Sequence, residues 1–91
     1  MNLDVNFVNN YNYTHGHYDR ARDQFERIAE KYPDHAFAHY FLAKTMERQK
    51  SKDSNTINFH YDQFQVIMQK DEKWREYAQY FNIKTEPTVK L

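Results

Sequence analysis

Apolar residues recur at helical spacing through the middle of the chain, three or four positions apart, with charged residues between them. In the first such stretch they are Tyr18, Ala21, Phe25, Ile28, Ala29 and Tyr32. This spacing places them on one face of an α-helix and the charged residues on the opposite face. Pro33 ends the helix, because proline has no backbone N–H to continue the hydrogen-bond pattern. The pattern therefore predicts a helix over residues 18–32.

The next segment, residues 36–48, is predicted to be an unusually apolar helix. Asp34 stands where it can cap the first turn. The apolar residues are Ala36, Phe37, Ala38, Tyr40, Phe41, Leu42, Ala43 and Met46. A helix that is apolar on more than one face is packed on more than one side, or offers one side to a partner.

Three more helices complete an all-α prediction with five helices. After a polar loop at residues 49–56, Asp53 or Ser54 is suited to cap a helix over 56–70, and Asp71 to cap one over 73–82. A weaker apolar stripe predicts a helix over 3–14, where several asparagines lower the helix propensity. We expect an irregular tail at residues 84–91. With 1 Gly and 2 Pro the chain has few turn signals, which favours long helices over many short strands.

Composition narrows the class of protein. Phe, Tyr and Trp make up 18% of the 91 residues, so we expect one folded domain, over residues 1–83, with a core more aromatic than aliphatic. Thirteen basic residues balance 13 acidic ones, which argues against a nucleic-acid or anionic-membrane partner. We find neither a membrane-spanning apolar run nor a signal peptide, and expect a cytoplasmic protein.

Nothing in the sequence indicates catalysis, a metal site or a cofactor. The chain has no Cys and one Gly, which excludes thiolate chemistry and a glycine-rich phosphate loop. His15 and His17 form one close pair, and His35 and His39 form another. Neither pair comes with a carboxylate motif such as H-E-x-x-H. We therefore expect a non-enzymatic protein.

An internal repeat links the two halves of the chain. The tripeptide DQF at residues 23–25 recurs at residues 62–64, and Ile28 then matches Ile67. Each copy lies in a predicted helix that is followed by a turn and another helix, which is the organisation of a helical repeat.

Residues 16–33 resemble the second half of a tetratricopeptide repeat (TPR), whose pattern is G-x-Y-x-x-A-x-x-x-F-x-x-A-x-x-x-x-P. The matching residues are Gly16, Tyr18, Ala21, Phe25 and Pro33. The resemblance implies units at about residues 2–35 and 36–72, with a closing helix at 73–82. Stacked as antiparallel helix–turn–helix pairs, they would form a short right-handed superhelix. The second unit is degenerate: it lacks the glycine and has His60 where the family has a small alanine.

The resemblance also implies a function. In TPR proteins the first helix of each pair lines a concave groove that binds a peptide or protein segment. By position, the groove residues in this chain are Asn6, Asn10, Phe37, Tyr40, Lys44, Glu47 and Gln79. Amides suit the backbone of an extended peptide, and aromatic rings suit an apolar side chain. The same residues are also compatible with solvated surface or with core packing.

A second interpretation is an assembly or regulatory segment of a larger multidomain protein, for example a signalling protein. Two helix pairs are few for a repeat domain, and the first unit has no capping helix before it. Self-association is therefore a further expectation, beside a protein or peptide partner.

Overall fold

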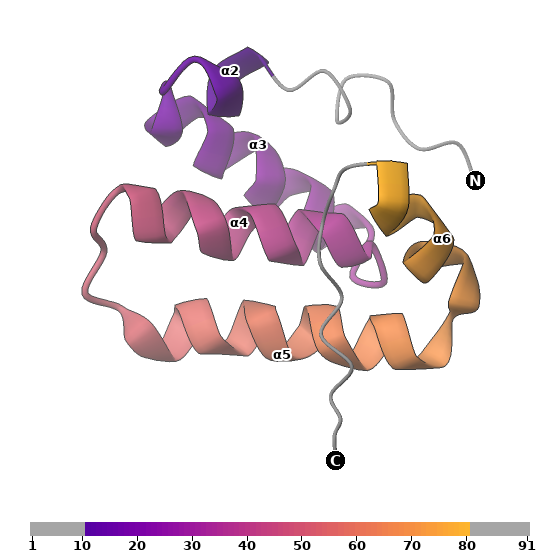
Figure 1. Cartoon of the computed structure of the whole chain (residues 1–91). Helices are drawn as coiled ribbons and strands as arrows, with labels where there is room; N and C mark the ends of the chain where they lie inside the picture. The colour runs from indigo at the N-terminus through magenta and orange to yellow at the C-terminus, as the bar shows by residue number, and fades with distance from the viewer. Residues whose placement is uncertain (1–10, 81–91) are drawn as a thin grey trace.

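The structure is a computed structural model that describes residues 11–80, and within this range it consists of five α-helices and no strand (Figure 1). The helices are α2 (Tyr11–Thr14), α3 (Tyr18–Lys31), α4 (Ala36–Arg48), α5 (Ser54–Lys70) and α6 (Glu72–Tyr80). The all-α prediction is confirmed. Most of the predicted helix over residues 3–14, the end of the helix over 73–82 and the tail over 84–91 lie outside the described residues.

Helix α4 is the centre of the arrangement. Figure 1 shows α5 running antiparallel to α4, and α3 crossing behind it. Both helices pack against α4, while α2 packs on α3 and α6 on α5. Eight side chains of α4 are buried: Ala36, Phe37, Ala38, His39, Leu42, Ala43, Thr45 and Met46. This explains the apolar composition of α4, because neighbours cover most of its circumference.

The prediction of a core more aromatic than aliphatic is wrong for the buried residues, where four aromatic side chains stand among fifteen apolar ones; five of the six partly buried hydrophobic residues packed against them are aromatic. Ala21 and Ala43 are fully buried, and such small side chains let the backbones of two helices approach closely. Beside them the ring of Phe25 stacks on that of Phe41 at 5.8 Å between centroids. At the other end of α4, the ring of Phe37 meets the indole of Trp74 edge to face at 5.2 Å. Offset and edge-to-face contacts of this kind are the preferred geometries of aromatic pairs.

The turns between paired helices depend on residues with positive φ. Gly16, with φ of 80°, lies between α2 and α3, and Lys50, with φ of 59°, lies between α4 and α5. Lys50 donates its backbone N–H to the Glu47 carbonyl, and Ser51 donates to the Met46 carbonyl. This pair of bonds is the Schellman motif, in which the left-handed residue is usually glycine.

Two of the three predicted helix caps are confirmed. The Asp53 carboxylate accepts hydrogen bonds from the backbone and the hydroxyl of Thr56, and these bonds lower the pKa of Asp53. Asp71 Oδ1 accepts from the backbone N–H of Lys73 at 3.1 Å. The assignment of Asp34 was wrong: His35 is the N-cap of α4, and its Nδ1 accepts from the backbone N–H of Ala38. Asp34 belongs to the turn that follows Pro33, one residue too early to reach that N–H.

Candidate functional site

Three of the residues predicted to contact a partner lie together on the central helix. Tyr40, Lys44 and Glu47 are spaced by four and three positions, which places them on one face of α4. Tyr40 and Lys44 are half-buried and Glu47 is exposed, on a helix that is otherwise mostly buried. We call these three residues the Tyr40–Glu47 face.

The Tyr40–Glu47 face is held in place by its own contacts and by α5. Lys44 Nζ lies 5.6 Å from the centroid of the Tyr40 ring, a cation–π distance. The Tyr40 ring packs on Phe64 at 4.9 Å and approaches Tyr61 at 6.0 Å. These contacts hold the half-buried Tyr40 ring next to the Lys44 cation, with Glu47 one turn beyond Lys44 on the same helix.

Tyr61 is a member of this site that sequence reasoning missed. Its hydroxyl donates to Glu47 Oε1 at 2.7 Å. Burial raises the pKa of Tyr61, and the hydrogen bond to Glu47 raises it further, so the phenol remains a donor at neutral pH. The apolar period of residues 56–70 includes Tyr61 but carries no information about where its hydroxyl points.

Phe37 does not fit its predicted role in a groove. Its side chain is fully buried, enclosed between α4 and α6 against Trp74. The prediction failed because the face of α4 that carries Phe37 is covered by the closing helix. The core-packing alternative applies at this position, and Phe37 is removed from the contact set.

The remaining predicted contact residues lie elsewhere. Gln79 is exposed on α6. Asn6 and Asn10 lie outside the described residues.

A histidine pair links α4 to α5. His39 Nε2 lies 2.8 Å from the Pro33 carbonyl oxygen, which can only accept, so Nε2 carries the proton. His39 Nδ1 must then accept from His60 Nδ1, at 2.9 Å. His39 is buried and His60 is half-buried, and burial together with the charge of His39 lowers the pKa of His60. The pair is therefore a hydrogen-bonded link between two helices.

The geometry of this pair does not suit a metal ion. Zinc binds histidine nitrogens at about 2.0–2.1 Å, so two nitrogens 2.9 Å apart would enforce an angle of about 90° instead of a tetrahedral one. His35 and His39 do not form a pair either, since His35 caps α4 while His39 bonds to His60. Within residues 11–80, no group of three or more His, Cys, Asp and Glu residues is placed to hold a metal.

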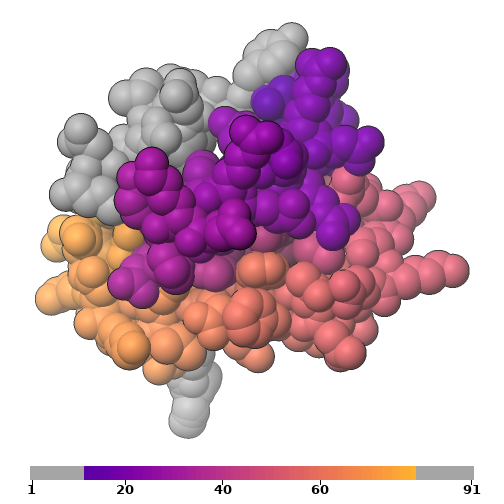
Figure 2. Space-filling view, turned by 180° about the vertical axis from the view of Figure 1, so that it is seen from behind, coloured from indigo at the N-terminus to yellow at the C-terminus, as the bar shows by residue number. Residues whose placement is uncertain are grey.

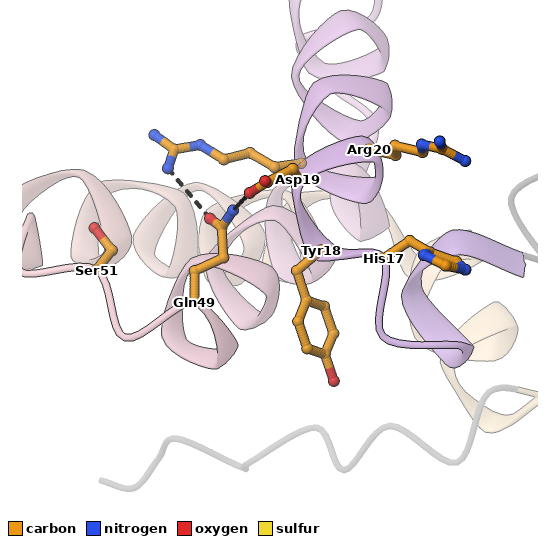
Figure 3. A pocket seen from close by; sticks show the side chains of 7 residues that line it. His17, Tyr18, Asp19, Arg20, Gln49 and Ser51 are labelled. Carbon is orange, nitrogen blue, oxygen red and sulfur yellow. Dashed lines mark hydrogen bonds between the residues drawn. The ribbon is translucent and has the colours of Figure 1, made fainter.

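A polar pocket of about 670 Å³ lies where the start of α3 meets the turn after α4 (Figure 3). Gln49 Nε2 donates to Asp19 Oδ1 at 2.6 Å, and Arg22 Nη1 donates to Gln49 Oε1 at 3.2 Å. Arg22 Nε also pairs with Glu26 at 3.2 Å. Figure 3 shows Arg20 directed away from Gln49, so the two arginines do not converge on one point. The hydrogen bonds that Gln49 makes in the pocket therefore connect α3 to the C-terminal end of α4.

No helix in the described part of the chain is long and apolar enough to cross a membrane. Comparison of the chain with protein-family models, curated proteins and solved structures finds no match.

Proposed function

We propose that this chain is a non-catalytic protein–protein interaction module of the TPR type, which binds a peptide or protein segment on the Tyr40–Glu47 face. The observation that carries the proposal is the accessibility of this face on a helix that is otherwise mostly buried. An aromatic ring, a cation and a carboxylate held side by side can contact an apolar side chain and both polar groups of a peptide backbone.

The arrangement of the helices supports the TPR part of the proposal. Gly16 and Lys50, the two residues with positive φ, occupy the turns inside successive helix pairs. They are separated by about one 34-residue TPR unit. Ala21 and Ala43 are fully buried between α3 and α4, where the family places small residues between successive pairs. In this proposal the pairs form a short right-handed superhelix, and Gln79, Asn6 and Asn10 extend the binding surface beyond α4.

A charge exchange on the binding face tests the proposal without loss of a core side chain. Tagged wild-type chain and the double variant Lys44→Glu/Glu47→Lys are used to capture proteins from the source cell, and captured proteins are quantified by mass spectrometry. We expect at least one protein to be enriched by the wild type and lost with the variant. Direct titration of that protein into both chains then measures the change in affinity.

The matched control exchanges another exposed pair. Asp23 and Arg27 form a surface ion pair at 3.2 Å on α3, so Asp23→Arg/Arg27→Asp also reverses two charges. The control is expected to retain capture, and both variants are expected to keep the helical circular dichroism of the wild type. Equal capture by the wild type and the Lys44→Glu/Glu47→Lys variant would contradict the proposal.

A further inference from the structure

An apolar groove of about 330 Å³ lies between α3 and α5, on the opposite side of α4 from the Tyr40–Glu47 face. Leu42, which contributes to the floor of the groove, follows Tyr40 by two residues, about 200° around the helix. Figure 2 shows the molecule from the back, a view in which both α3 and α5 are visible. The groove is thus a surface separate from the proposed binding face.

The groove has an apolar floor and a partly exposed aromatic wall. Ala29 and Leu42 are buried beneath it, and Phe59 forms part of its wall with 53% of the residue exposed. Val66 lies seven residues after Phe59, on the same side of α5, and is 43% exposed. Among the described residues, only Tyr32 is a further exposed large hydrophobic residue. Two of the three therefore lie on one side of α5, with Asp62 and Gln63 between them, and of these two only Phe59 lines the groove.

The charges along the groove are of one sign. Glu26 and Glu30 of α3 line it, and none of the described residues that line it is a lysine or an arginine. Glu26 already pairs with Arg22, one turn earlier on α3. His60 also lines the groove, and its lowered pKa keeps the imidazole neutral at pH 7. The groove thus joins an apolar floor to a negatively charged edge.

We propose that the groove between α3 and α5 is a second docking surface, for a partner segment that presents a basic side chain next to an apolar one. The apolar side chain would lie against Phe59, over the floor formed by Ala29 and Leu42. The cation would reach Glu30 and Glu26, and the exposed ring of Phe59 adds a cation–π contact. Charge complementarity selects this occupant, because an acidic segment would be repelled by the same edge.

The test uses the full chain labelled with ¹⁵N and a defined probe, the tetrapeptide acetyl-Leu-Arg-Leu-Arg-amide. Its counterpart with citrulline in place of arginine keeps the shape and removes the charge. We expect backbone amide shifts centred on residues 59–66 and on Glu30 when the arginine peptide is added. Binding of the citrulline peptide is expected to be at least about threefold weaker, in keeping with the small energy of exposed ion pairs.

Two double variants test whether the peptide responds to the carboxylates of the groove or to the net charge of the protein. Glu26→Gln/Glu30→Gln removes both carboxylates of the groove, and Glu72→Gln/Glu76→Gln removes the same charge from exposed positions of α6. We expect the groove variant to weaken the arginine peptide at least about threefold and the α6 variant to leave its affinity unchanged. Phe59→Ser, at an exposed position, is expected to weaken both peptides.

Three outcomes would overturn the proposal. The first is equal affinity in the two double variants. The second is a set of shifts centred on the Tyr40–Glu47 face, which would assign the peptide to the other surface. The third is a shift of the groove amides with protein concentration alone, which would make a second copy of the chain the occupant. The charge exchange at Lys44 and Glu47 leaves the groove intact, so failure of one proposal is distinguishable from failure of the other.

Discussion

Helices α3 and α5 occupy equivalent places in the internal repeat but meet α4 in different ways. When the two DQF tripeptides are aligned, Ala21 of α3 corresponds to His60 of α5. Ala21 is fully buried, and its methyl group allows a close approach to α4. His60 is only half-buried and instead hydrogen-bonds to His39 of α4. The same repeat position can therefore join two helices either through a small side chain or through a hydrogen bond, and the hydrogen bond requires a partner on the facing helix.

The position that the two helices share is aromatic. Phe25 and Phe64 are both buried, each against a ring of α4: Phe25 stacks on Phe41 and Phe64 packs on Tyr40. The two copies of the repeat therefore share the large buried phenylalanine and differ at the position of the small alanine.

The largest expected effect on stability comes from truncation of the phenylalanine that α3 and α5 share. Phe25→Ala and Phe64→Ala should each lower the free energy of unfolding by about 3–5 kcal/mol, because truncation removes buried apolar area and leaves a cavity. Urea denaturation followed by circular dichroism measures the change. Phe59→Ala, at an exposed position, serves as the control and should change the free energy by about 0.5 kcal/mol or less. A cost for Phe59→Ala equal to that of Phe64→Ala would contradict the burial pattern.

Substitutions at the position where the two repeats differ, Ala21 in α3 and His60 in α5, should lower the free energy of unfolding by unequal amounts. Ala21→His places an imidazole where there is no room, and should cost about 3 kcal/mol from overpacking and from burial of polar atoms. His60→Ala removes a half-buried ring and one hydrogen bond, and should cost about 1–2 kcal/mol. Thermal and urea unfolding of both variants measure the two effects. If His60→Ala proved the more harmful of the two, the hydrogen bond would matter more than the close approach.

The turns α2–α3 and α4–α5 each contain a residue with positive φ, which is Gly16 in the first turn and Lys50 in the second. Lys50→Gly should raise the free energy of unfolding by about 0.5–1 kcal/mol, because glycine adopts positive φ without steric cost. Gly16→Ala should lower it by about 1 kcal/mol through backbone strain alone, because an added Cβ at Gly16 meets no atom within 4 Å. Lys50→Ala, which keeps the strain of an L-residue, is the control and should leave stability nearly unchanged. Destabilisation by Lys50→Gly would contradict the turn geometry.

The smallest expected effect is a dependence of stability on pH that arises at His60 of α5. The pKa of His60 is lowered from its ordinary value of 6.5 by burial and by His39, while Glu26 opposes the shift. As the pH falls through 6.5 the unfolded chain binds a proton before the folded chain does, so the free energy of unfolding decreases towards the lower pKa of the folded state. His60 is half-exposed, so solvent screening should keep the loss below about 1 kcal/mol.

Melting temperatures at pH 7.5 and 5.5 measure this effect. His60→Gln removes the titrating group, so its loss of melting temperature between the two pH values should be smaller than that of the wild type. Equal losses in the two proteins would show that His60 does not contribute to the pH dependence.

The sequence predicted the helices well because their signals are local. The apolar period gave residues 18–32, 36–48 and 56–70, and the structure has Tyr18–Lys31, Ala36–Arg48 and Ser54–Lys70. Pro33 stopped a helix and Asp53 started one for reasons confined to a few neighbouring backbone groups. The missed cap at His35 is an exception, since any residue with an acceptor can take that place once the turn sets the first residue of the helix.

The candidate site was less predictable because it depends on which helix covers which face. Phe37 and Tyr40 are three residues apart on the same apolar helix, and sequence alone assigned them the same role. Helix α6 buries Phe37, while the neighbours of Tyr40 leave it half-exposed. The bond from Tyr61 to Glu47 was likewise beyond the sequence, because it joins side chains of two helices.

Spacing and short-range sterics thus predict the helices α3, α4 and α5, with their ends to within two residues, and the repeated phenylalanine. The pairing of His39 with His60, the burial of Phe37 and the exposure of Phe59 beside Glu26 and Glu30 depend instead on tertiary contacts. The physical reason is that an apolar side chain carries the same signal whether or not another helix covers it, and covering depends on contacts between distant parts of the chain.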